Sequence, residues 1–168
     1  MRPFGKKPST GLEVFALHAE SLCEAAAKLS LSTQSFIALI ACDSDQLPVE
    51  EIGQFAIALM EEGAIFACCW GKGCERFHDI IDETWVDCQL GGKYGAVAKD
   101  STLMTTWHND ESLDEALWFL LFSAFQNDED PKPCSMVAIT IGNESWASNV
   151  SLRLQNVPKF NDEMVSRG

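Results

Sequence analysis

A short and almost wholly apolar run decides the fold, and it reads Ser35-Phe36-Ile37-Ala38-Leu39-Ile40-Ala41-Cys42. Its apolar residues stand at consecutive positions rather than alternate ones, so both faces of the segment need cover. Such a run is typical of a strand inside a parallel sheet, where helices lie on both faces. The stretch Asp43-Ser44-Asp45 ends it, which places polar residues at the carboxyl end of a predicted buried strand.

The segments that follow alternate between helical and strand-like patterns. Pro48 precedes Glu50, Glu51 and an apolar stripe at helical spacing, so we expect a helix to begin there. Ser112 and Glu115 have the spacing of a capping box, which predicts a helix from residue 113 to about residue 126. The other predictions downstream are strands over residues 64–70, 103–107 and 136–141 and helices over residues 74–85 and 143–154.

The amino-terminal part completes the pattern. Apolar residues recur at three- and four-residue steps, or multiples of them, across residues 12–29, which predicts a helix. The order α-β-α-β-α-β-α-β-α implies parallel strands joined by right-handed crossovers. We therefore predict an α/β fold, a three-layer α/β/α sandwich that is Rossmann-like or flavodoxin-like, with a mostly parallel sheet of four to five strands. Residues 11–155 are expected to form a single domain between a flexible arm, residues 1–10, and a loose tail, residues 156–168.

Length and charge limit the class of protein. The chain has 168 residues and a net charge of −13, which is enough chain for one proper core. It has no basic stripe that would neutralise phosphates, which argues against nucleic acid and against an anionic membrane surface as partners. A basic protein stays open as a partner, because an acidic surface steers cationic surfaces towards it.

Two observations favour a cytoplasmic location. The basic start of the chain is not followed by the apolar run that a signal peptide needs. The seven cysteines are odd in number, and several stand in apolar strand-like runs, as free thiols in a core do. No Cys-x-x-Cys pair occurs, so we expect neither a metal site nor a cofactor.

Polar side chains gather after the predicted strands. Ligands of open parallel sheets bind beyond the carboxyl ends of the strands, so these residues form the expected site. The candidates for catalysis are His108, His78, Asp110 and Asp43, and those for ligand binding are Asp45, Trp70, Gly71, Arg76, Trp107 and Asn143. His108 stands between a strand and a capped helix, where Asp110 or Glu111 would orient it as a general acid or base.

Each motif also has a structural interpretation. Asp43 and Asp45 resemble the start of a haloacid-dehalogenase-type phosphatase, but the residues after them do not continue that pattern. The stretch Gly71-Lys72-Gly73 before a helix suits either an anion or a simple turn. Cys74 and His78 share a helix face, where a histidine would activate a thiol, although Cys–His enzymes usually take the pair from separate elements.

The run from Ala116 to Phe122 is apolar on all sides of its predicted helix. Such a helix is either deeply buried or covers a partner. It suggests a homodimer that forms through the surface near Trp118.

Two stretches are similar to a family of small uncharacterised bacterial proteins. They are Cys69 to Asp79, which contains the pattern W-G-x-x-C-E-R-x-H-D, and Thr105 to Phe119, which begins with the pattern T-T-W-H. The resemblance covers about residues 35–150. It implies a bacterial source and that the two stretches belong together, and it names no activity. The predicted fold places the two stretches at neighbouring strand ends.

Two functions remain open. In the first, a small acidic module acts by binding another protein, as an immunity, antitoxin-like or regulatory subunit does. In the second, a hydrolase or nucleotide-binding domain uses His78, His108 and nearby acids at the strand ends. The second function requires that His78, His108 and Asp43 converge on one pocket, because catalytic groups must reach one reacting atom.

Overall fold

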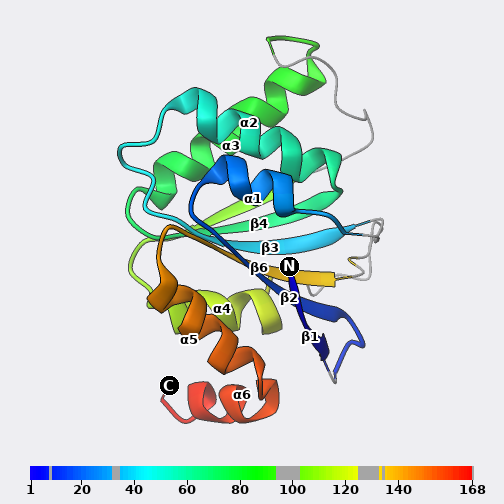
Figure 1. Ribbon diagram of the computed structural model, residues 1–168, viewed down its shortest axis with the longest axis vertical. Coiled ribbons are helices and arrows are strands. Elements are labelled where there is room, and N and C mark those ends of the chain that lie inside the picture. Colours follow the sequence, from blue (N-terminus) through cyan, green and yellow to red (C-terminus); the bar gives the residue numbers. More distant parts are fainter. Residues whose placement is uncertain (8, 32–34, 94–102, 125–132, 134, 168) are drawn as a thin grey trace.

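The computed structural model describes residues 1–7, 9–31, 35–93, 103–124, 133 and 135–167. A six-stranded sheet runs through it in the order β1-β2-β6-β3-β4-β5 (Figure 1). β1 (Arg2–Lys6) is antiparallel to its neighbour. The parallel strands are β2 (Glu13–Ala19), β6 (Ser135–Ile141), β3 (Phe36–Ala41), β4 (Ala64–Trp70) and β5 (Met104–His108). The mostly parallel sheet is confirmed, with six strands rather than the four to five predicted.

The apolar run that was quoted first forms the central strand β3. β6 and β4 flank it, with Leu39 opposite both Ala138 and Cys68. Every residue of β3 is at most 1% exposed. Continuous apolarity therefore identified this strand correctly, because helices cover both of its faces.

The helices form the two outer layers of the sandwich (Figure 1). α1 (Leu22–Lys28), α2 (Val49–Glu61) and α3 (Cys74–Gln89) pack on one face, around Phe36, Ala38 and Ile40 of the central strand. α4 (Leu113–Phe122), α5 (Glu144–Leu154) and α6 (Val157–Val165) lie on the other side, where the core contains Ile37 and Leu39. The alternation of side chains along β3 thus supplies two separate apolar cores, and the predicted three-layer fold is confirmed.

Capping residues fix the starts of the helices. The Ser112 hydroxyl accepts a hydrogen bond from the Glu115 N–H, and the Glu115 carboxylate accepts one from the Ser112 N–H at 2.6 Å. The predicted capping box is therefore confirmed. Pro48 stands at the N-cap of α2, one residue before the first helical position.

The prediction for the amino-terminal residues is wrong in two places. Residues 12–29, predicted as one helix, divide into β2 and α1, and the predicted flexible arm contains β1. β2 lies beside β6, and it buries Val14 and Leu17 in the two different cores. The true helix start is Ser21, whose Oγ accepts from the Glu24 N–H at 3.2 Å. The spacing of Ser21 and Glu24 was an available signal, which the helical periodicity concealed.

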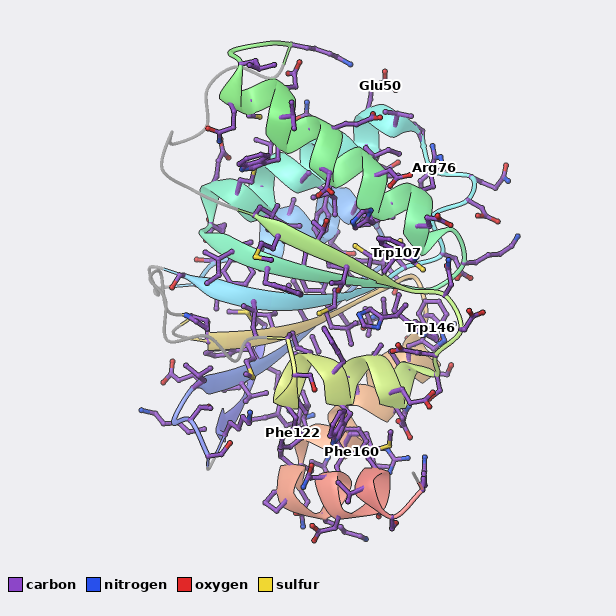
Figure 2. The ribbon with its side chains drawn as sticks, turned by 180° about the vertical axis from the view of Figure 1, so that it is seen from behind. Glu50, Arg76, Trp107, Phe122, Trp146 and Phe160 are labelled. Carbon is purple, nitrogen blue, oxygen red and sulfur yellow. The ribbon has the colours of Figure 1, made fainter. Side chains whose placement is uncertain are left out.

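The predicted loose tail contains helix α6 instead. Phe160 is 2% exposed in the core that α4 also joins, and Figure 2 shows Phe122 and Phe160 between α4 and α6. Asn161 accepts a hydrogen bond from the Trp118 indole at 3.0 Å. The apolar helix α4 therefore has an intramolecular neighbour on the side of Trp118. The homodimer through this surface stays a prediction.

Apolar packing holds the described core together, and the described cysteines are free thiols. Cys23 is exposed, whereas the others are buried, namely Cys42, Cys68, Cys69, Cys74 and Cys88. Within the described ranges, no helix combines the length and the apolarity needed to cross a membrane.

Candidate functional site

The topology places crevices at the carboxyl edge of the sheet. The chain leaves β2, β3 and β4 towards α1, α2 and α3 on one face, and leaves β5 and β6 towards α4 and α5 on the other. Neighbouring strands whose connections go to opposite faces leave a gap between them, and ligands of open α/β sheets bind at such gaps. In this strand order the gaps occur around β6 and between β4 and β5.

The first crevice, named here the β6 cleft, lies at the ends of β2, β6 and β3 and has a volume of about 260 Å³. The carboxylates of Glu20, Asp43 and Glu51 line it, together with Asn143 and the indole of Trp146. None of its described lining residues is a lysine, an arginine or a histidine. The β6 cleft is therefore a negatively charged pocket with one aromatic wall.

Backbone hydrogen bonds hold the walls of the β6 cleft. Gly142, at a φ of +65°, donates its N–H to the Ala19 carbonyl at 2.8 Å, which joins the ends of β6 and β2. The Asn143 Oδ1 atom then accepts from the Trp146 N–H at 3.2 Å and fixes the first turn of α5. Figure 2 shows Trp146 and Trp107 near the same end of the sheet, on opposite sides of it. Trp146 therefore stands in the first turn of α5, which Asn143 caps.

The thiol of Cys42 lies at the β6 cleft, and the negative charge of the cleft affects its pKa. Cys42 is 3% exposed and belongs to the cleft lining. Burial, together with the negative charges of Asp43 and Glu51, raises the pKa of this thiol to about 12. Negative charges that destabilise a thiolate stabilise a cation at the same place.

The second crevice, named here the β5 cleft, lies between the ends of β4 and β5 and has a volume of about 380 Å³. Its lining residues are Asp43, Trp70, Gly71, Lys72, Gly73, His108, Asn109 and Glu111. The Trp70 indole closes one side, because it donates to the Glu111 carbonyl at 2.8 Å. Asp43 lines both clefts, so the end of β3 is their common boundary.

Hydrogen bonds join the loops that follow β3 and β4. Ser44 is fully buried and donates from its N–H to the Lys72 carbonyl at 2.7 Å and from its Oγ to the Gly73 carbonyl at 2.8 Å. The Arg76 guanidinium donates to the carbonyls of Ser44 and Leu47, both at 2.9 Å. Arg76 therefore positions the loop after β3, and its role in ligand binding stays a prediction.

Lys72 is also used within these loops. Its N–H donates to Asp43 Oδ1 at 2.8 Å, and its ammonium lies 2.7 Å from Asp45 Oδ2, a hydrogen bond that raises the pKa of the lysine. Gly71 has a φ of +112°, and a Cβ atom there would lie 2.5 Å from the Cys42 carbonyl oxygen. From the sequence, Gly71-Lys72-Gly73 suited either an anion site or a simple turn. In the structure it is a tight turn whose lysine pairs with Asp45.

His108 belongs to a hydrogen-bonded chain in the β5 cleft. The imidazole is 5% exposed, and its Nδ1 lies 2.7 Å from Glu111 Oε2. Its Nε2 lies 3.1 Å from the Thr106 hydroxyl, and the ring packs against Phe119 with centroids 4.7 Å apart. Of the two acids proposed from the sequence, Glu111 orients the imidazole, while Asp110 is exposed.

His78 lies outside the β5 cleft. Its ring meets the Trp107 indole with centroids 4.6 Å apart, and its nitrogens face Asp79 at 3.0 Å and Asp82 at 3.5 Å. The structure therefore brings Asp43 and His108 to one cleft and leaves His78 and Trp107 as a separate pair on the side of α3.

Cys74 is buried at the start of α3. It is 1% exposed, and its Sγ donates to Asn109 Oδ1 at 2.9 Å. Burial raises the pKa of the thiol, so the neutral form is favoured. Although Cys74 shares a helix with His78, its hydrogen-bond partner is an amide oxygen and not a base.

Sequence reasoning missed Glu20, Glu51 and Trp146 of the β6 cleft and Thr106 of the His108 chain. Glu20 was hidden because β2 was taken as part of a helix. Thr106 and His108 are two residues apart on one strand and so share a face, which was an available signal. Over the ranges that the structure describes, no group of three or more His, Cys, Asp or Glu side chains is placed to hold a metal ion.

A family model matches most of the chain. It is described as a domain of unknown function, DUF7684, and it matches residues 14–156. No protein with a curated description matches the sequence. The family match confirms the resemblance to an uncharacterised family, and it extends further towards the amino terminus than the two motifs indicated.

Proposed function

We propose that this chain, which belongs to the DUF7684 family, is a binding module that holds a basic segment of a protein partner at the carboxyl edge of its sheet. One observation carries this proposal. The β6 cleft presents three carboxylates and an indole at the point where domains of this architecture bind their ligands.

The chemistry of the β6 cleft suits an arginine or lysine side chain. Glu20, Asp43 and Glu51 provide acceptors for charge-assisted hydrogen bonds, and the indole of Trp146 is a cation–π partner for a side chain in the cleft. A volume of about 260 Å³ lies below the roughly 300–1,000 Å³ of typical small-molecule sites, so it fits one side chain better than a whole cofactor.

The overall charge supports the same kind of partner. A net charge of −13 creates a field that accelerates the approach of a basic protein. The nearby cations are mostly engaged elsewhere, because the Lys72 ammonium pairs with Asp45 and the Arg76 guanidinium donates to loop carbonyls. The Lys72 N–H donates to Asp43 Oδ1, and His18 Nε2 lies 3.4 Å from Glu20 Oε1, so each of these two carboxylates has a neighbour while the cleft keeps an excess of acidic side chains.

A peptide titration followed by NMR tests this proposal. The probe is a Gly/Ser dodecapeptide with two central arginines, and its matched control carries citrulline, which keeps the shape and removes the charge. We expect the arginine peptide alone to shift the Gly142 amide and the Trp146 indole N–H signals. The affinity should fall as the salt concentration rises, because exposed charges are screened.

A pair of variants with the same change of charge makes the test specific. Glu51→Gln should weaken the arginine peptide roughly tenfold, because one charge-assisted hydrogen bond is lost. Glu83→Gln, on the exposed surface of α3, should leave the affinity unchanged. Equal binding of the arginine and citrulline peptides, or equal effects of the two variants, would contradict the proposal.

The chain of Thr106, His108 and Glu111 favours a second candidate function, ester or amide hydrolysis beside the β5 cleft, whose lining includes His108 and Glu111. A hydroxyl within hydrogen-bond reach of an imidazole, which in turn contacts a carboxylate, is the arrangement of an activated nucleophile with its base and orienting acid. This candidate needs His108 and not His78, because His78 lies elsewhere.

Hydrolysis of p-nitrophenyl acetate separates this candidate from simple binding. If His108 is the base, His108→Gln should lower the rate about 100-fold or more, and Thr106→Val should do the same. His78→Gln is the control and should change little. A rate that survives both of the first two changes would exclude hydrolysis by this chain of residues.

A further inference from the structure

A groove between α1 and α2 lies next to the β6 cleft and has a volume of about 640 Å³. Its lining comes from both helices: Leu22, Cys23, Ala26, Glu50, Glu51, Gln54, Phe55, Ile57, Ala58 and Glu61. α1 has only 7 residues while α2 has 13, so α1 is too short to cover the length of its neighbour. The groove is thus a consequence of the β2–α1 arrangement that the sequence prediction missed.

The groove is apolar along its middle and acidic along the α2 side of its rim. Ala26, Ile57 and Ala58 are partly exposed in it, above the buried side chains of Leu22 and Phe55. The charged residues among its described lining are all glutamates of α2, namely Glu50, Glu51 and Glu61. The exposed Lys93 ammonium lies 3.5 Å from Glu50 Oε1, a surface pair that a cationic occupant can displace. The groove is therefore complementary to an occupant with an apolar face and a positively charged flank.

The groove and the β6 cleft are adjacent, because Leu22 and Glu51 line both. Figure 2 shows Glu50 at the end of α2 that lies towards the carboxyl edge of the sheet. Glu50 and Glu61 are eleven positions apart on one helix, which corresponds to about 17 Å, or about three helical turns. An occupant of this length can cross the groove and still reach the β6 cleft.

We propose that the α1–α2 groove binds the apolar face of a basic amphipathic helix about three turns long, supplied by the partner protein. The proposal rests on the proposed function in one respect, since an arginine of this helix is to enter the β6 cleft. Apolar side chains at helical spacing fill the groove, and lysine or arginine on the flank beside α2 meets the three glutamates. A second copy of this chain is a poor occupant, because a two-fold contact through the groove would bring the two acidic rims together.

Designed peptides test the groove separately from the cleft. The probe is a 14-residue helix-forming peptide with leucine at i, i+3, i+4 and i+7, lysine on its flanks and one terminal arginine. Three matched peptides replace the leucines by serine, the flanking lysines by glutamate, or the arginine by citrulline. We expect a loss of affinity of about tenfold or more for the serine and glutamate peptides, measured by fluorescence anisotropy.

Protein variants locate the binding. Ala58→Gln fills the groove without a change of charge and should weaken the leucine peptide about tenfold or more, and Ala26→Gln does the same from the opposite wall. Leu152→Gln, at an exposed position on α5, is the matched control and should leave the affinity within about twofold. Circular dichroism melting curves identify any variant that fails to fold.

The exposed thiol of Cys23 reports the position of the bound peptide. Cys134 lies outside the described residues, so the test protein carries Cys134→Ser. Among the described cysteines, Cys23 is the exposed one. A leucine peptide with an activated disulfide at its apolar face should transfer to Cys23 at least about tenfold faster than the serine peptide, with release of the leaving thiolate, because binding raises the effective concentration. Equal transfer rates would overturn the groove proposal.

The two proposals fail in different ways. If citrulline has no effect while Ala58→Gln still weakens binding, the groove stands and the β6 cleft proposal fails. If citrulline abolishes binding while Ala58→Gln, Ala26→Gln and the serine peptide have no effect, the cleft stands and the groove proposal is overturned. A dimer of the free protein that Ala58→Gln dissociates would also overturn it, in favour of a second copy.

Discussion

The indole rings of Trp70 and Trp146 meet edge to face, with centroids 5.1 Å apart and an interplanar angle of 80°. Trp70 lines the β5 cleft and Trp146 lines the β6 cleft. Their contact joins the end of β4 to the start of α5 and forms a wall between the two clefts. A substitution of either indole should therefore affect both the β5 cleft and the β6 cleft.

A double-mutant cycle on Trp70→Leu and Trp146→Leu should give a coupling energy of about 1 kcal/mol, as edge-to-face aromatic pairs do. Urea unfolding of the four proteins measures it. Trp85→Leu on α3 is the control, because its effect should add to that of Trp146→Leu within roughly 0.5 kcal/mol. A coupling energy near zero would mean that the two rings touch without stabilising each other.

Ser44→Ala should destabilise the protein by about 1–3 kcal/mol, because it leaves the Gly73 carbonyl without its hydroxyl donor in a buried loop. Ser145→Ala removes a hydroxyl from an exposed hydrogen bond at the start of α5 and should change stability by less than about 0.5 kcal/mol. The free energies of unfolding in urea decide between them, and similar values for the two variants would contradict the role given to Ser44.

The central layer of the fold could be predicted from the sequence because its signals are local. The apolar runs of β3 and β4 and the capping box of Ser112 and Glu115 each depend on a few consecutive residues. β2 was not predicted because its residues also fit a helical period, and only its pairing with β6, more than 100 positions away, makes it a strand. Tertiary pairing overrode a local pattern there.

The candidate site was predicted in part for the same reason. Asp43 and Asp45 follow a strand that was recognised and His108 is the last residue of another, so their placement at the carboxyl edge followed from the topology rule. The β6 cleft needed the end of β2, which brings Glu20, and the order of the strands, which brings Trp146 beside it. Strand order depends on long-range contacts that a single sequence does not display.

Arg153→Lys should destabilise the protein by about 2 kcal/mol. The guanidinium binds both Asp114 oxygens, at 3.1 and 2.6 Å, and Glu163 at 2.8 Å, so it joins α5 to α4 and α6. A lysine cannot reproduce this forked geometry, and the partly buried Asp114 carboxylate would lose a donor. Arg167→Lys, whose exposed guanidinium lies 3.6 Å from the same carboxylate, should change stability by less than about 0.5 kcal/mol.

Alkylation should distinguish the cysteines by their burial. At pH 8, iodoacetamide should modify Cys23 within minutes and leave Cys42 unmodified, because Cys42 is buried and its pKa is raised to about 12. Peptide mapping by mass spectrometry identifies the modified residues. Rapid modification of Cys42 in the native protein would mean that the β6 cleft opens far enough to expose this thiol.

Glu115 should make the stability of α4 depend on pH in acid. Hydrogen bonds from the Ser112 hydroxyl and backbone lower the pKa of Glu115 below its usual 4.5, so the carboxylate is better stabilised in the folded state than in the unfolded state. This contribution is fully present above about pH 4.5 and is lost as the pH falls through the lowered pKa of the folded state. Glu115→Gln should therefore destabilise the protein at pH 7 and differ less from the wild type as the medium is acidified. Urea unfolding curves between pH 7 and pH 3 give this difference, and Glu83→Gln on the exposed surface of α3 supplies the control. A difference that stays constant over this range would show that folding does not lower the pKa of Glu115, and would contradict the prediction.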